Sequence, residues 1–202
     1  MMAGRARGHV DGSAIRLLII VLLGVAAIAV PWLTHNQLVE RREAVAAAWA
    51  DVESNLQRRA ELVPNLVRSL QAHMDYEGET LTQLVRERAQ GLREALNEAR
   101  GDPARLARLE AALTHDLGRL MSRAGEHPEL RSGDQFLRFQ AQLEGSDNRI
   151  NVARMRYNAA VRDYNASLEG FFGRWVADAM GLLPGDYFEA PAGAHEPLVV
   201  EF

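Results

Sequence analysis

Cysteine is absent from this chain of 202 residues. Its absence excludes disulfide bonds, thiolate nucleophiles and metal sites with sulfur ligands. An excess of basic charge is also missing, because Lys and Arg together number 23 against 27 acidic residues, for a net charge of -4. The basic residues are dispersed instead of gathered along one face, so the sequence predicts no nucleic-acid partner.

The recognisable signatures of enzymes are missing as well. The sequence contains no HExxH, phosphate-binding loop, GxSxG or dinucleotide-binding fingerprint. Helical bundles that hold two iron ions use Glu-x-x-His pairs, and no histidine in this chain has a glutamate three residues before it. We therefore expect a protein that is not an enzyme, with no catalytic, cofactor-binding or metal-binding residues and no cofactor.

Charge is missing between Arg16 and His35, where the chain reads LLIIVLLGVAAIAVPWLT. As a helix this run spans roughly 27 Å, close to the hydrocarbon thickness of a bilayer. Trp32, near its end, is a residue type typical of the membrane–water interface. The pattern predicts a short tail over residues 1–14, a transmembrane anchor over residues 15–34 and contact with the lipid bilayer.

A cleaved signal peptide is the alternative, because Ala27-Ile28-Ala29 resembles a cleavage site. The apolar run continues past this site for longer than a signal peptide needs, which favours the anchor. Arginines before the run slightly outweigh those after it within the distance that matters, and this favours a cytoplasmic N-terminus. The arginines compared are Arg5, Arg7 and Arg16 against Arg41 and Arg42.

Apolar residues after the anchor follow steps of four and three, which is the heptad pattern of packed helices. They are Leu38, Val45, Trp49, Val52, Leu56, Val63, Leu66 and Leu70, with Arg42 and Arg59 in two gaps. The pattern predicts a first helix over residues 37–74. Pro64 lies inside it and removes one backbone donor, so we expect a kink there, since the pattern keeps its phase on both sides.

Three more helices are predicted. The second covers roughly residues 79–99, and the third begins at Asp102-Pro103, an N-cap followed by proline at the first helical position. Ser132 and Gln135 offer a capping box for the fourth. In the fourth helix large residues recur at every seventh position, with small residues three positions after most of them, which lets a partner helix approach closely. The large residues are Phe136, Leu143, Ile150, Tyr157, Tyr164 and Phe171.

The long ordered blocks of these helices resemble those of the LemA family of bacterial membrane-anchored proteins. The blocks are RRxxLxPNLV within residues 36–79, LEGxxNRI followed by YNxxVxxYN within residues 136–165, and YFEA at residues 187–190. The resemblance implies an N-terminally anchored antiparallel helical bundle in the bacterial cytoplasmic (inner) membrane. It also implies no established enzymatic activity, and relatives linked to building membrane compartments.

Helix lengths add a geometric expectation. The first and fourth helices of about 38 residues are near 57 Å long, and the second and third, of about 20 residues, are near 30 Å. With short connections the four alternate in direction. The sequence therefore predicts an all-α fold, in which a transmembrane helix is followed by an antiparallel four-helix bundle with two long and two shorter helices over residues 35–183. Near the membrane, only the first and fourth helices continue, as a bare pair.

Equal heights on the two long helices bring Arg58 and Arg59 beside Glu144, Asp147 and Asn148. We predict a polar layer that joins Arg59 to Glu144 or Asp147. Its structural interpretation is control of register, because a buried ion pair adds little net stability but penalises slipped pairings. Its functional interpretation is a binding site where four helices become two.

The bare pair leaves apolar surface that something must cover. An amphipathic segment follows the fourth helix, and its few charges favour packing on the protein over lying on the bilayer or meeting another subunit. The candidate interaction surface consists of Trp49, Phe171, Phe172, Trp175 and Met180. Residues 184–202 are rich in Pro, Gly and Ala, which indicates an extended or mobile tail.

Two functions remain compatible with the sequence. The favoured one is a non-catalytic scaffold or assembly protein in membrane or envelope organisation, which forms a homo-oligomer or joins other membrane proteins. The alternative is an accessory or sensor subunit that binds and modulates another membrane protein, such as a protease.

Overall fold

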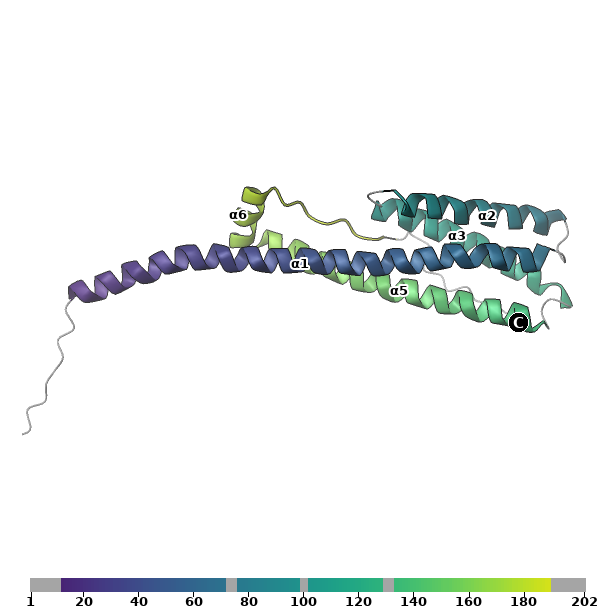
Figure 1. The fold of residues 1–202 in the computed structure, drawn as a ribbon, viewed down its shortest axis with the longest axis horizontal. Coiled ribbons are helices and arrows are strands. Elements are labelled where there is room, and N and C mark those ends of the chain that lie inside the picture. The colour runs from purple at the N-terminus through teal and green to yellow at the C-terminus, as the bar shows by residue number, and fades with distance from the viewer. Residues whose placement is uncertain (1–11, 72–75, 99–101, 129–132, 190–202) are drawn as a thin grey trace, which may run out of the picture.

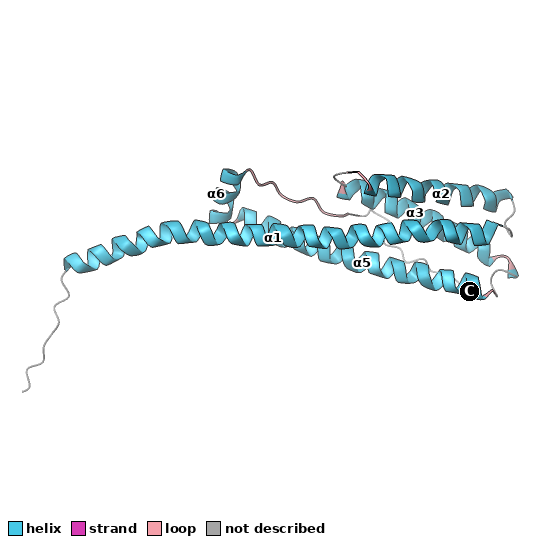
Figure 2. Ribbon diagram, viewed as in Figure 1, coloured by secondary structure: helices cyan, strands magenta, loops and turns pink. Residues whose placement is uncertain are grey.

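The computed structural model describes residues 12–71, 76–98, 102–128 and 133–189. In this part of the chain every regular element is an α-helix and no strand occurs (Figure 2). The predicted all-α class, with a long apolar N-terminal helix leading into a bundle, is confirmed. The elements are α1 (Gly12–Gln71), α2 (Tyr76–Leu96), α3 (Pro103–Gly125), α5 (Asp134–Glu169) and α6 (Phe171–Met180).

α1 is one uninterrupted helix of 60 residues. Its N-terminal part is long and apolar enough to cross a membrane, and its C-terminal part is the first helix of the bundle. The helix runs through Pro31 and Pro64, and it curves gently in its N-terminal part (Figure 1). α1 does not end at Pro64. A bend of the helix at this residue stays a prediction. No boundary separates the predicted anchor from the predicted bundle helix.

α5 lies along α1 in the opposite direction, and the α2–α3 hairpin packs against the end of α1 that is remote from the apolar segment (Figure 1). We call this end distal and the opposite end membrane-proximal. Four helices therefore form a bundle at the distal end. Toward the apolar segment only α1 and α5 continue, and there α6 contacts both of them.

The ends of the shorter helices follow local signals. The Asp102 carboxylate accepts a hydrogen bond from the Ala104 amide at 2.9 Å, and Pro103 is the first residue of α3, as predicted. α2 begins at Tyr76, three residues before the predicted start. The N-cap of α5 is Gly133, whereas the predicted cap Ser132 lies outside the described residues.

The buried core residues lie at the predicted apolar heptad positions, here called the seam of each helix. In α1 the apolar seam positions from Val52 to Leu70 are buried, and of the two gap positions Arg42 is exposed and Arg59 is buried. In α5 the seventh-residue series is buried from Phe136 to Tyr164. Phe171 departs from this series because α5 ends at Glu169, and the extended backbone of the next glycine starts a new helix.

Candidate membrane-proximal site

The chain beyond α6 returns along α5 as an extended segment, Gly181–Glu189, here called the strap (Figure 1). It begins at Gly181, whose φ of 65° lies in the left-handed region that glycine adopts without strain. Near its other end the Phe188 side chain is 1% exposed. The part of the predicted tail that is described is therefore extended and bound to the bundle, and residues 190–202 lie outside the description.

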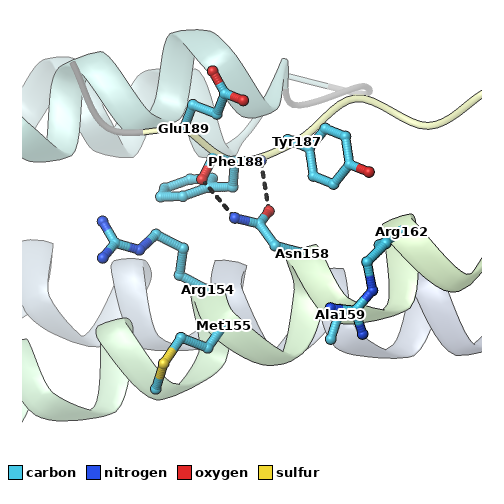
Figure 3. Close-up of a pocket in the computed structure, with 8 residues that line it drawn as sticks. All are labelled: Arg154, Met155, Asn158, Ala159, Arg162, Tyr187, Phe188 and Glu189. Carbon is cyan, nitrogen blue, oxygen red and sulfur yellow. Dashed lines mark hydrogen bonds between the residues drawn. The ribbon is translucent and has the colours of Figure 1, made fainter. Parts of the chain in front are cut away.

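Two asparagines of α5 hold the backbone of the strap, each through two hydrogen bonds. The Asn165 amide donates to the Gly185 carbonyl at 3.0 Å, and its oxygen accepts from the Gly185 N–H at 2.8 Å. The Asn158 amide donates to the Phe188 carbonyl at 3.2 Å and accepts from the Phe188 N–H at 2.9 Å (Figure 3). Each side chain thus satisfies a backbone donor and acceptor that the strap would otherwise leave unpaired.

The tyrosine that precedes each asparagine binds the strap as well. The Tyr164 hydroxyl donates to the Leu183 carbonyl at 3.2 Å, and the Tyr157 hydroxyl donates to the Asp186 carbonyl at 2.8 Å. Burial raises the pKa of Tyr157 from 10.0 to about 12, and the nearby Asp186 carboxylate adds to the shift. The Tyr157 phenol therefore remains a hydrogen-bond donor across the physiological pH range.

The spacing of the two Tyr-Asn pairs matches the geometry of the strap. Seven residues of helix rise about 10.5 Å, and three residues of extended chain span about 10 Å. Tyr157 and Asn158 accordingly bind the strap three residues further along than Tyr164 and Asn165 do. The repeated dipeptide in YNAAVRDYN is the sequence signal for this site, and the sequence analysis used it for helix packing and for the family resemblance but not to predict a bound segment.

Trp49 is half-buried and packs between α5 and the strap, so its place in the predicted interaction surface is corrected. Its ring centroid is 5.0 Å from that of Tyr157 and 6.1 Å from that of Phe188. The prediction expected the segment after the fourth helix to cover this surface, whereas the residue that contacts Trp49 is Phe188, further along the chain in the strap.

α6 packs one face on the bundle. A Cβ added at Gly173 would lie 1.8 Å from the Ser167 carbonyl oxygen, so only glycine permits this close approach of α6 to the end of α5. Val176 and Ala177 are buried in a cluster whose other members are Leu38, Tyr164 and Leu168. The other residues of the predicted interaction surface, Phe171, Phe172, Trp175 and Met180, are exposed.

A shallow groove runs beside the strap on α5 (Figure 3). Arg154 and Arg162 lie two helical turns apart on either side of Asn158, and the exposed Met155 adds an apolar contact. Tyr187 and Glu189 of the strap form the opposite wall. The arginines give this groove the chemistry to receive a carboxylate of another protein segment.

Arg59 forms a polar layer inside the distal bundle. Its Nη1 donates to Glu110 Oε1 of α3 at 2.9 Å and also to Asp147 Oδ1 of α5. The Thr114 hydroxyl donates to the same oxygen of Glu110 at 2.8 Å. Glu110 was missed, because its partner on α1 becomes clear only once the packing of α3 is known.

The remaining residues of the predicted layer stay apart from Arg59. Glu144 accepts instead from Gln140 at 3.0 Å and is exposed. Arg58 and Asn148 are also exposed, because neighbouring positions of a helix differ by about 100° in direction. These three residues are therefore removed from the layer. Among the described residues no group of three or more His, Asp or Glu side chains is arranged to hold a metal ion.

Comparison with known proteins matches residues 48–202 to the model of the LemA family. The magnetosome proteins MamQ 1 and MamQ 2 of Paramagnetospirillum magneticum are each 28% identical over 201 residues, which cover 88% of this chain and 73% of the relative. Protein LemA of Metamycoplasma hominis is 20% identical over 155 residues, which cover 77% of this chain and 68% of that protein. The matched range includes the distal bundle, α6 and the strap, and the chain belongs to the LemA family.

Proposed function

We propose that this chain is a non-catalytic, single-pass membrane protein that acts as a scaffold and assembles with itself or with other membrane proteins. The main support is α1, in which one helix of 60 residues connects the apolar segment to the whole length of the bundle without a linker. A helix of this length extends about 90 Å. The bundle therefore keeps a defined direction relative to its anchor, which suits a protein that positions partners at a membrane.

The similarity to proteins named as magnetosome proteins supports a role in membrane organisation. We place the chain in the bacterial cytoplasmic membrane with a cytoplasmic N-terminus. Because the chain lacks cysteine, a Met155→Cys variant tests this orientation with a membrane-impermeant maleimide. Labelling of intact spheroplasts is expected, and labelling only after lysis would reverse the orientation.

The size of the detergent-solubilised protein, measured by light scattering, tests the scaffold. We expect a large homo-oligomer. A matched Arg154→Glu/Arg162→Glu variant reverses the charge of the groove beside the strap, and a smaller particle would place the assembly contact there. A monomer that recovers one membrane protein in a pull-down would contradict the scaffold and support an accessory subunit.

A further inference from the structure

The outer face of α6 consists of large apolar side chains. Phe171 is 86% exposed, Phe172 48% and Trp175 63%, and Leu183 at the start of the strap is 79% exposed. The rings of Phe171 and Phe172 pack edge to face with their centroids 5.0 Å apart, so the two side chains form one contiguous apolar surface. A contiguous apolar surface of this kind marks an interaction site.

The height of α6 is set by its contact with α1. Its buried face packs in a cluster with Leu38, which lies four residues after Thr34 at the end of the uncharged run. Four residues of helix rise about 6 Å. The polar headgroup region is about 5–8 Å thick on each side of the hydrocarbon core. When α1 crosses a bilayer, α6 therefore lies at the level of the headgroups.

The outer face of α6 is turned toward the membrane. α5 runs toward the apolar segment and α6 follows its end, while the residues that cover the buried face, Tyr164 and Leu168 among them, lie on the bundle side of that end. On a helix, positions 171 and 175 lie opposite positions 173 and 177, and position 172 lies at the edge between the two faces. α6 also lies crosswise to α1, as a helix in the plane of a bilayer would (Figure 1).

The positions of the tryptophans agree with this orientation of α6. The chain has three, of which Trp49 packs against Tyr157. Trp32, close to the end of the uncharged run, is 67% exposed, and Trp175 on α6 is 63% exposed. Tryptophan is favoured where its apolar ring meets lipid and its N–H meets water. The two exposed tryptophans therefore lie at the level where a bilayer would receive them.

We propose that α6 is an interfacial helix whose Phe171, Phe172 and Trp175 side chains enter the headgroup region of the bilayer that α1 crosses. The only charged residues of α6 are Arg174 and Asp178, so buried apolar area, and not attraction to anionic lipid, drives the contact. The proposal rests on the membrane crossing by α1 and is independent of the scaffold role. It gives the bundle a second contact with lipid, which fixes its rotation about α1.

Nitroxide labels on single cysteines of the full chain in phosphatidylcholine vesicles test this contact. The variants are Phe171→Cys on α6, Leu33→Cys in the apolar segment and Leu137→Cys at the distal end of α5, all exposed positions in a chain without cysteine. Spin relaxation measures how often each label collides with oxygen, which concentrates in lipid, and with a nickel chelate, which stays in water. We expect the Phe171→Cys label to match Leu33→Cys, with oxygen collisions in excess, and to differ from Leu137→Cys.

Each other outcome overturns the proposal. A Phe171→Cys label that is open to nickel like the Leu137→Cys label lies in water. A label shielded from both reagents is covered by protein, which identifies a second copy as the occupant. If the Leu33→Cys label is itself open to nickel, α1 does not cross the bilayer and the proposal fails at that step. A Trp175→Cys variant repeats the measurement one turn along the same face.

Discussion

Arg59 and its two partners differ in their access to water. The Arg59 side chain is 2% exposed, whereas those of Glu110 and Asp147 are 14% and 33% exposed. Removing the arginine leaves carboxylates that water can reach. Removing both carboxylates leaves a guanidinium that cannot recover its hydration. Loss of the two carboxylates should therefore cost more folding free energy than loss of the arginine.

We expect the Glu110→Gln/Asp147→Asn double variant to lower the free energy of unfolding by about 3–5 kcal/mol, because it leaves the charge of Arg59 buried and unpaired. Arg59→Leu should cost clearly less. Urea unfolding followed by circular dichroism in detergent measures both. Arg58→Leu, at an exposed neighbouring position, is the matched control with little expected change. Equal losses for Arg59→Leu and the double variant would contradict this difference.

Tyr157 makes stability depend on alkaline pH. Its pKa is raised from 10.0 to about 12 in the folded protein, so the folded state holds this proton more tightly than the unfolded state. The contribution is fully present below pH 10 and is lost as the pH rises from about 10 to about 12. The Tm of the protein should fall more steeply over this window than the Tm of Tyr157→Phe. Parallel curves for the two proteins would refute the shift.

At the scale of elements, the strap shows where sequence reasoning stops. Arg59 was predictable because a charged residue interrupts an apolar seam. The burial of Tyr157 and Tyr164 was predictable because both recur in a heptad. The role of Asn158 and Asn165 was missed, because their repeat marks one side of the contact only: the partners are backbone atoms of the strap, which carry no residue-specific signal.

The strap should detach when an asparagine loses its donor. Asn165→Asp keeps the acceptor for the Gly185 N–H but places a carboxylate oxygen against the Gly185 carbonyl. The loss is about 1–3 kcal/mol of local stability, and it should accelerate amide hydrogen exchange in residues 181–189. Asn151→Asp, two heptads earlier and exposed, is the same chemical change without a strap contact. Similar exchange in both variants would refute the role of Asn165.

The packing of α6 against the end of α5 depends on Gly173. Gly173→Ala places a Cβ against the Ser167 carbonyl, so α6 must move away and hydrogen exchange in residues 171–180 should increase. Gly91→Ala is the matched control, because a Cβ at this position in α2 has no neighbour within 4 Å. It should stabilise the protein by about 0.5–1 kcal/mol by favouring the helix. An increase in Tm for Gly173→Ala would show that α6 is not held by this contact.

At the scale of the whole molecule, the predicted lengths of two long and two shorter helices account for a thick distal end and a thin membrane-proximal end (Figure 1). The same reasoning treated the anchor over residues 15–34 and the first bundle helix from residue 37 as separate segments, and α1 is continuous through both. Leu38, the first position of the predicted heptad pattern, is part of the buried cluster beneath α6. The heptad seam of the bundle therefore starts almost where the span ends.

Lengthening α1 should lift the whole molecule. Seven helix-forming residues inserted between Thr34 and His35 raise the bundle by about 10 Å and nearly preserve its rotation, because seven residues are close to two turns. A nitroxide at Phe171→Cys should then become open to the nickel chelate, while one at Leu33→Cys stays in lipid. An unchanged Phe171→Cys label would show that the position of α6 does not depend on α1.

When α1 crosses a bilayer, its continuity makes the bundle tilt together with the apolar segment about the bilayer surface. From Thr34 to the end of α1 at Gln71 the helix extends about 55 Å, and a tilt of about 20°, common for membrane helices, displaces the distal tip sideways by about 19 Å. A thinner bilayer increases the tilt of a span that is too long for it. Differences in lipid thickness of a few ångströms therefore move the distal end of the bundle sideways by a distance similar to the width of two helices.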